Sequence, residues 1–356
     1  MRTIPRAEPV PRVAEIGWDW NLPAGFPQPL VPADNPMTAE KVRLGRFLFY
    51  DTRLSGNATS ACATCHRPEL AFTDGRPRAV GSTGERHPRG AMSLVNVAYN
   101  ATYTWADPRL ERVEDQMLVP LSGHDPIELG IGGREREVLE RFRGDPELLA
   151  LFREAFPSDA DPLTLQSVVR AIAAFTRTIL SGDSPYDRFV YRGEGDAMSA
   201  SARRGMRLFF SERLRCAECH GGFTFSGPIR FEGAADIAPT FHNTALYDLD
   251  GQGAYPPENT GLHAVTGAAV DMGRFRAPTL RNVAVTAPYM HDGSVATLDE
   301  VIDLYAAGGR APKNPLKSER LSGFSIDAAE KRDLLAFLDS LTDHGFLTDP
   351  TLGDPR

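Results

Sequence analysis

All four cysteines of the chain lie in two copies of one five-residue pattern. The copies read Cys62-Ala-Thr-Cys65-His66 and Cys216-Ala-Glu-Cys219-His220. Two thiols one helical turn apart can form thioethers with the two vinyl groups of one porphyrin, and the adjoining histidine then presents an imidazole nitrogen to iron. The pattern therefore predicts two covalently bound haem c groups, with His66 and His220 as iron ligands.

Two other kinds of site use the same cysteine spacing. One zinc ion could take four sulfurs from the two pairs, but Cys65 and Cys216 lie far apart in the chain. A dithiol redox site is expected beside a βαβ pattern, which neither pair follows. Both alternatives stay open, although the histidine after each pair favours haem.

Composition sets the class of protein. The 356 residues are 42% hydrophobic and 24% charged, which is ordinary for a soluble globular protein of about two domains. A net charge of −8 argues against a nucleic-acid partner. No apolar run approaches the length of a membrane span. Because haem of this type is attached outside the cytoplasmic membrane, we expect a periplasmic protein whose leader is missing from this chain.

Apolar spacing and end signals predict the helices that position the two motifs. One helix precedes each motif, and further helices follow a long loop in each half. The expected helices are Ala39–Tyr50, one opened by Asp145-Pro146, Leu163–Leu180, Ser199–Phe210, one opened by a Thr297–Glu300 capping box, and Asp327–Leu341. The stretch from Arg67 to about Arg134 is expected to be irregular.

This pattern predicts a mainly α fold of two cytochrome c-like haem domains with long irregular loops. Residues 1–37 are expected to form an extended, Pro-rich arm. The first haem domain is expected over 38–183 and the second over 184–356, with the boundary in the polar segment Ser181–Met198. The second half repeats the plan of the first.

Several longer phrases resemble the bacterial di-haem cytochrome c peroxidase/MauG superfamily. They are LGRFLFYDTRLSGNATSACATCH, SLVNVAYN and FRAPTLRNVAVTAPYMHDGSVATLDEV. Within it, WNLPAGFPQPLVPADNP, Leu180–Phe189 and GLHAVTGAAVDMGRFRAPTLRN are most similar to MbnH-type di-haem enzymes. The resemblance implies two haems that face a shared interface, with peroxide bound at the first haem and electron transfer at the second.

The resemblance also implies a second ligand, besides His220, for the iron of the second haem. Tyr305 matches a position where peroxidases of the superfamily have Met and MauG-like members have Tyr. Leu298, Ile302 and Tyr305 share one helical face, so a core aromatic is the alternative. An anionic phenolate lowers the reduction potential relative to Met, which favours high oxidation states.

At the first haem, the resemblance assigns residues that would act on peroxide. Glu128, in HDPIELG, matches an acid/base glutamate that moves a proton between the two peroxide oxygens. Gln116 and Pro120 match other positions of that pocket, and Arg276 matches an arginine that could stabilise negative charge. The alternatives are a surface-loop glutamate and a salt-bridging surface arginine.

Peroxidases of the superfamily place a displaceable histidine after the first motif. His87 is the candidate here, but its spacing differs, so we expect an exposed loop histidine and an open first iron. The histidines expected to bind no metal are His124, His242, His263 and His344.

Two further assignments come only from the resemblance. Trp105 matches an indole between the haems that could share an oxidised hole, with core packing as the alternative. Asn96, Thr286 and Pro288 match positions that hold a calcium ion between the domains through oxygen atoms.

The activity implied is a MauG/MbnH-like oxidation driven by hydrogen peroxide. A high-valent di-haem state would oxidise an aromatic residue of a partner protein by long-range electron transfer, with tryptophan converted towards kynurenine in the most similar group. MauG carries a relay tryptophan before its second motif, where this chain has Leu214 and Arg215. The sequence therefore does not identify the route by which an oxidised hole would reach the surface. The alternatives are a peroxidase that reduces hydrogen peroxide to water with electrons from a small redox protein, and a non-catalytic electron carrier.

Overall fold

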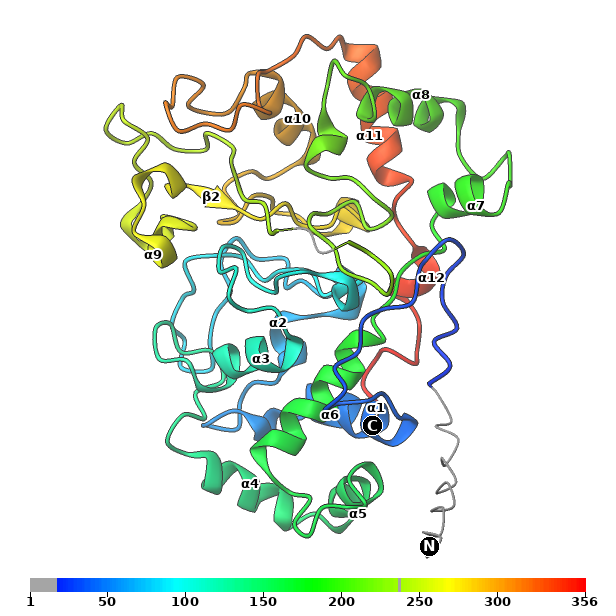
Figure 1. Ribbon diagram of the computed structural model, residues 1–356, viewed down its shortest axis with the longest axis vertical. Helices are drawn as coiled ribbons and strands as arrows, with labels where there is room; N and C mark the ends of the chain where they lie inside the picture. The colour runs from blue at the N-terminus through cyan, green and yellow to red at the C-terminus, as the bar shows by residue number, and fades with distance from the viewer. Residues whose placement is uncertain (1–17, 236–237) are drawn as a thin grey trace, which may run out of the picture.

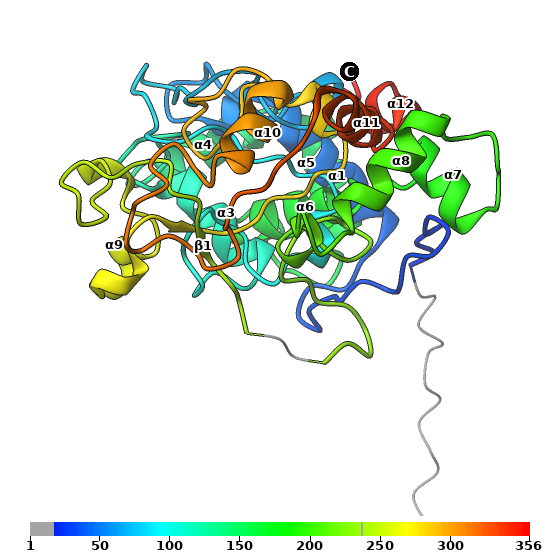
Figure 2. The ribbon, with the colours of Figure 1, turned by 90° about the horizontal axis from the view of Figure 1, so that it is seen from above.

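The computed structural model describes residues 18–235 and 238–356, which are mainly helical (Figures 1 and 2). Its α-helices are α1 (Ala39–Tyr50), α2 (Cys62–Cys65), α3 (Val113–Ser122), α4 (Glu135–Arg143), α5 (Pro146–Ala155), α6 (Leu165–Arg177), α7 (Pro185–Tyr191), α8 (Ala200–Phe209), α9 (His263–Thr266), α10 (Leu298–Ala306), α11 (Ala328–Asp339) and α12 (His344–Leu347). Two short strands, β1 (His242–Asn243) and β2 (Arg274–Phe275), pair antiparallel with His242 opposite Phe275. The predicted mainly α class is confirmed.

The two helix starts for which the sequence indicated a side-chain cap carry that cap. The Asp145 carboxylate accepts from the backbone N–H groups of Glu147 and Leu148 at the start of α5. Thr297 and Glu300 form a reciprocal capping box at the start of α10. Because these bonds satisfy N–H groups that have no partner inside the helix, local sequence fixes where each helix begins.

Each half contains a helix pair that crosses at a glycine. In the lower half of Figure 1, α1 packs on α6, and in the upper half α8 packs on α11. A Cβ on Gly45 would lie 1.9 Å from the Ala171 carbonyl oxygen, and one on Gly205 would lie 1.9 Å from that of Asp333. Only hydrogen fits at either crossing, so both halves use the same packing device.

A second repeated feature links each pair to the loops around it. Asn96 and Asn282 both have left-handed backbones and each precedes a short 3₁₀ turn. The Asn96 N–H donates to the Ile179 carbonyl just after α6, and the Asn282 N–H donates to the Leu341 carbonyl just after α11. The second half therefore repeats the plan of the first.

A buried hydrogen-bond network joins the two halves. The Ser181 hydroxyl donates to the Asp343 carboxylate (3.1 Å) and accepts from the Asn282 amide (2.9 Å). The Ser181 backbone N–H also donates to the Asn96 side-chain oxygen (3.0 Å). Because all four side chains are buried, this network fixes the position of one half relative to the other.

The last residues of the chain return to the first half. Phe346 of α12 packs against Phe72 with ring centroids 5.9 Å apart, and the Tyr50 hydroxyl donates to the Leu352 carbonyl at 2.6 Å. The C-terminus accordingly lies beside α1 in Figure 1. The proposed domain ranges stay a prediction, and residues 1–17 of the proposed arm lie outside the described residues.

Two segments differ from the sequence-based expectation. The stretch 67–134, expected to be irregular, contains α3, in which Pro120 stands near the end, where its missing N–H costs one helical bond. The segment 181–198, expected to be a polar boundary, contains α7. Ser184 caps α7 and Pro185 occupies its first turn, both of which are ordinary helix starts.

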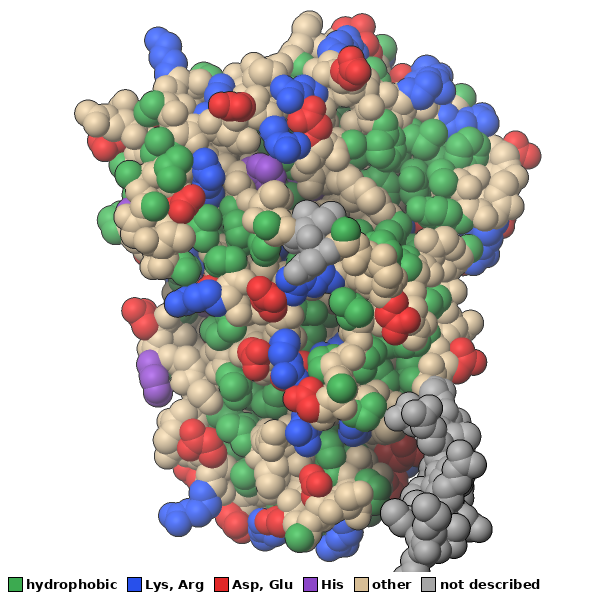
Figure 3. Space-filling model, in the orientation of Figure 1, with side chains coloured by type: hydrophobic (Ala, Val, Ile, Leu, Met, Phe, Trp, Pro, Cys, Tyr) green, Lys and Arg blue, Asp and Glu red, His purple; other side chains and the backbone are tan. Residues whose placement is uncertain are grey.

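Helix length and surface charge bear on the expectation, drawn from the sequence, that the chain has no membrane span. In the described ranges, no helix combines the length and the apolar character that a bilayer crossing requires. Acidic and basic side chains alternate over the face shown in Figure 3.

Candidate functional site

Two cavities lie where the halves meet, and each contains one cysteine motif. Cys62, Cys65 and His66 line the first cavity, and the second is lined by the other motif together with Tyr305. The two cysteine pairs are thus separate. Within residues 18–235 and 238–356 no three His, Cys, Asp or Glu side chains gather to hold a metal ion, so the four-sulfur zinc alternative is wrong.

The first motif folds as α2, which places Cys62 and Cys65 one turn apart, and His66 ends the helix. The His66 Nδ1 lies 2.8 Å from the Phe72 carbonyl oxygen, to which it can donate. That bond leaves the lone pair of Nε2 available for iron. Burial raises the pKa of Cys62 to about 12 and that of Cys65 to about 11, so both thiols are neutral.

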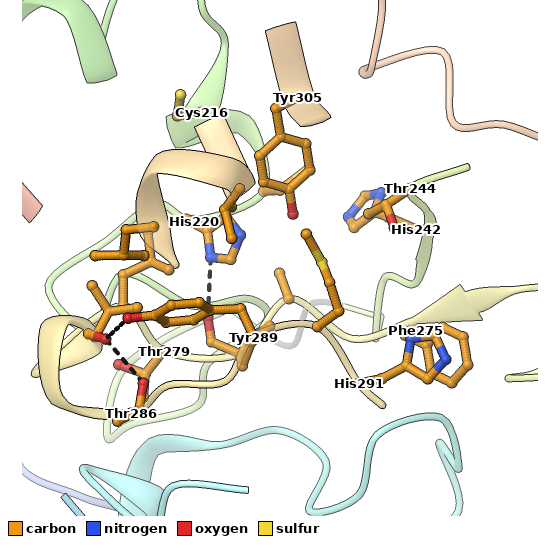
Figure 4. A pocket seen from close by; sticks show the side chains of 18 of the residues that line it. Cys216, His220, His242, Thr244, Phe275, Thr279, Thr286, Tyr289, His291 and Tyr305 are labelled. Atoms are coloured by element: carbon orange, nitrogen blue, oxygen red, sulfur yellow. Dashed lines mark hydrogen bonds between the residues drawn. The ribbon is translucent and has the colours of Figure 1, made fainter. Parts of the chain in front are cut away.

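The second motif folds as a 3₁₀ turn over Cys216–Glu218, and its histidine is also held by a backbone carbonyl. The His220 Nδ1 lies 3.0 Å from the Pro278 carbonyl oxygen, and burial lowers the pKa of His220 to about 4, so the imidazole is neutral. Figure 4 shows His220 and Tyr305 entering one cavity, with the Tyr305 hydroxyl directed into it from α10. Burial raises the pKa of Tyr305, so its phenol loses the proton only beside a strong positive charge.

Trp105 and Arg276 line both cavities and form part of the wall between them. The Arg276 N–H donates to the Trp105 carbonyl (2.8 Å), and the Trp105 indole donates to the Gly90 carbonyl (3.1 Å). Arg276 is only 4% exposed, so the surface-arginine alternative is wrong. Burial lowers the pKa of Arg276 to about 10, and it still carries its charge at neutral pH.

These residues fit covalently bound haem. Each cavity offers two neutral thiols and one imidazole whose Nε2 is free to bind iron. Across the described chain, Arg276 forms no ion pair with a carboxylate, and an unpaired buried cation is costly. The carboxylate side chains that haem carries would supply that partner. Cys62, Cys65 and His66 would hold one haem, and Cys216, Cys219 and His220 the other.

The wall of the first cavity contains the predicted acid/base residue. Gln116 and Pro120 lie one turn apart on α3 and face this cavity together with Glu128. The Glu128 carbonyl accepts from the Ser82 N–H (2.7 Å), and the next residue, Leu129, donates to the Pro120 carbonyl (2.8 Å). Burial raises the pKa of Glu128 to about 7, and 35% of its side chain is still exposed. Its acid/base role stays a prediction.

His87 is not the exposed histidine that the sequence suggested. It lines the first cavity, with its Nε2 3.6 Å from a Glu128 carboxylate oxygen and only 24% of its side chain exposed. Burial lowers its pKa to about 4. The hairpin that carries it folds onto residues 127–128, as the close approach of Gly81 to the Ile127 carbonyl shows. This tertiary contact has no signal in local sequence.

Two further histidines line the second cavity, where the sequence did not place them. His242 stands near Tyr305, and His291 stacks on Phe275 with centroids 3.8 Å apart (Figure 4). The sequence around these two histidines does not match a known ligand motif. His242 reaches the cavity through the pairing of β1 with β2.

The predicted calcium residues lie at the junction but do not form an obvious cage. Thr286 and Pro288 line the second cavity, whereas Asn96 exchanges two hydrogen bonds with the Ser181 backbone. The calcium site stays a prediction.

Comparison with known proteins agrees with this geometry. Residues 39–196 match the model of the di-haem cytochrome c peroxidase family. The chain is 36% identical to the methylamine utilization protein MauG of Methylorubrum extorquens, over 87% of this chain and 80% of that protein. It is 36% identical to cytochrome-c peroxidase IdrP1 of Denitromonas iodatirespirans, over 91% and 86% of the two chains. A crystal structure of a MauG-like protein associated with microbial copper homeostasis superposes with a TM-score of 0.93 at 46% identity, over 95% of this chain and 99% of that one.

Proposed function

Because the chain belongs to the di-haem cytochrome c peroxidase family and is a haem-dependent oxidoreductase that uses peroxide, we propose that it is an oxidase of the MauG/MbnH type. Cys62, Cys65 and His66 would hold one haem c group and Cys216, Cys219 and His220 the other, and with hydrogen peroxide these groups would supply the oxidising chemistry. The proposed reaction is the oxidation of an aromatic residue of a partner protein. Tryptophan is the proposed target. The protein acts in the periplasm, with a calcium ion between its halves.

Glu128 is the proton-transfer residue of this proposal. Its carboxylate faces the first cavity, and a pKa of about 7 lets it accept a proton and return it near neutral pH. Gln116 on α3 faces the same space and can orient peroxide by hydrogen bonding. Arg276 places a positive charge between the cavities, where negative charge develops during O–O cleavage.

The observation that carries the proposal is Tyr305 in the cavity of His220. A phenolate ligand lowers the reduction potential of iron relative to a thioether. The second iron site then favours the loss of an electron over the uptake of one. Trp105, in the wall common to both cavities, is placed to share the oxidising equivalents between the two sites.

One observation favours a second function, the reduction of peroxide to water with electrons from a small redox protein. His87 lines the first cavity beside Glu128 and could block the first iron until an electron arrives. The name of the IdrP1 relative points the same way. A pure electron carrier has less support, since it needs no acid/base residue such as Glu128.

Peroxide added to the fully oxidised protein separates these functions. The proposed oxidase forms a long-lived state two equivalents above ferric without prior reduction, and candidate partner proteins shorten its lifetime and gain oxygen by mass spectrometry. A protein that reacts with peroxide only after prior reduction is a peroxidase, and one that does not react in either state is a carrier.

A further inference from the structure

The proposed function requires a route by which electrons leave a partner and reach two buried cavities. Leu214 and Arg215, directly before the second motif, have no oxidisable ring. A different set of aromatic residues adjoins the second cavity. One hydrophobic cluster contains Trp105, Tyr305, Tyr255 and Tyr247.

Tyr255 is the buried middle of this set. It is 4% exposed and packs against Phe275 (6.3 Å between centroids) and His291 (6.4 Å), which both line the second cavity. Tyr255 also belongs to the same hydrophobic cluster as Tyr305. Its own hydroxyl donates to the Asn243 amide oxygen (2.8 Å), which is not basic enough to take a proton. Tyr255 can therefore pass an electron on, but a neutral tyrosyl radical is not stabilised there because its proton has no acceptor.

Tyr247 differs in exposure and in its hydrogen-bond partner. Its ring lies 5.5 Å from that of Tyr255, edge to face, and it is partly exposed. The Tyr247 hydroxyl donates to the Asp292 carboxylate at 2.6 Å. Asp292 is only 5% exposed. Burial raises the pKa of Asp292, but the hydrogen bonds from Tyr247 and from the Ser294 N–H (3.1 Å) keep the pKa below its usual value, so the acceptor is ionised.

We propose that Tyr247 is the surface end of the electron route, with Tyr255 connecting it to the second haem site and Asp292 accepting its phenolic proton. In each transfer, Tyr247 gives one electron inward and its proton to Asp292. The tyrosyl radical then takes one electron from the partner's aromatic ring and recovers the proton. Two transfers use the two oxidising equivalents of one hydrogen peroxide, which takes up two protons and is reduced to two waters. The twice-oxidised ring takes up one water as a hydroxyl group and releases two protons. This route rests on the proposed function.

The test uses the fully oxidised, haem-loaded protein, one equivalent of hydrogen peroxide and a nitroso spin trap, without a partner. Peptide mapping by mass spectrometry locates the trapped radical, and absorbance follows the oxidised state. The variants are Tyr247→Phe and Asp292→Asn, which keeps the side-chain shape but removes the proton acceptor. Tyr191→Phe is the matched control, since Tyr191 is half-buried and lines neither cavity. The resting spectrum of each variant verifies folding and haem content.

We expect the adduct on Tyr247 in the wild type, its loss in Tyr247→Phe, a several-fold reduction in Asp292→Asn and no change in Tyr191→Phe. The oxidised state should also persist several-fold longer in Tyr247→Phe. An oxidised state that forms normally but leaves no adduct on Tyr247, or decays at the wild-type rate in Tyr247→Phe, overturns the route alone. Failure of the wild type to form that state overturns the proposed function instead.

Discussion

At the scale of single residues, Glu128 and His87 face each other in the first cavity but titrate in different ranges. Burial raises the pKa of Glu128 to about 7 and lowers that of His87 to about 4. Only ionised Glu128 can accept the peroxide proton, so the rate of reaction with peroxide should rise as pH increases through about 7. His87 is neutral over this range and cannot produce that titration.

The Glu128→Gln variant should lose this pH dependence and react about 10²-fold or more slowly, the usual scale of general acid–base catalysis. Stopped-flow absorbance of the ferric protein mixed with peroxide measures both quantities. Glu154→Gln is the control, because Glu154 is an exposed residue of α5 that lines neither cavity. The assignment is wrong if Glu128→Gln keeps the wild-type profile.

Tyr305 competes with two other possible ligands in the second cavity, His242 and Met290. If Tyr305 binds iron, Tyr305→Met should raise the reduction potential of the second haem, because a neutral thioether stabilises ferric iron less than a phenolate does. His242→Ala and Met290→Leu should leave the potential in place. Spectroelectrochemical titration provides the comparison, and a potential that moves in either control but not in Tyr305→Met reassigns the ligand.

At the scale of elements, the helix crossings make a prediction about stability. Gly45→Ala improves the intrinsic helix propensity of α1 by about 1 kcal/mol, yet its methyl group would lie against the Ala171 carbonyl. We expect a net loss of about 1–3 kcal/mol in the free energy of unfolding from overpacking. Urea titration measures it, with Gly195→Ala as control, since a Cβ there meets open space. Equal or higher stability of Gly45→Ala would show that the crossing tolerates a methyl group.

The sequence predicted elements whose signals are local. The caps at Asp145 and Thr297 and the apolar stripe of α1 placed those helices correctly. The sequence-based prediction missed α3, because Pro120 and the polar residues around it obscure the helical spacing of its apolar residues. The motif spacing also identified the cysteines that line the two cavities, and the resemblance identified Glu128 and Trp105, which lie on cavity walls.

Burial that depends on distant contacts could not be predicted in this way. His87 enters the first cavity because its hairpin folds onto residues 127–128. Arg276 is buried because the second half presses its loop against the Trp105 segment of the first half. The pairing of Tyr247 with Asp292 also joins loops far apart in the sequence.

At the scale of the whole molecule, a buried ion pair within the second half also contacts the N-terminal segment. Arg281 and Asp187 form two hydrogen bonds of 2.8 Å, and both side chains are almost fully buried. The Arg281 guanidinium also lies 4.8 Å from the centroid of the Phe26 ring. Removing one partner leaves a buried charge without compensation.

Asp187→Asn should therefore lower the free energy of unfolding by about 3–5 kcal/mol. Asp183→Asn, which breaks the exposed pair with Arg192, should cost at most about 1 kcal/mol. Chemical denaturation of the haem-loaded variants compares them. Losses of similar size in the two variants would mean that the buried pair contributes no more to stability than the exposed one.

The central claim is that an open first iron works with a second iron held between His220 and Tyr305. Electron paramagnetic resonance of the resting ferric protein, with haem quantified on the same sample, tests it most directly. We predict two covalently attached haems, one high-spin and one low-spin, with the low-spin signal lost in Tyr305→Phe and the high-spin signal kept. Two low-spin haems, or a low-spin signal that is unchanged in Tyr305→Phe, would contradict the claim.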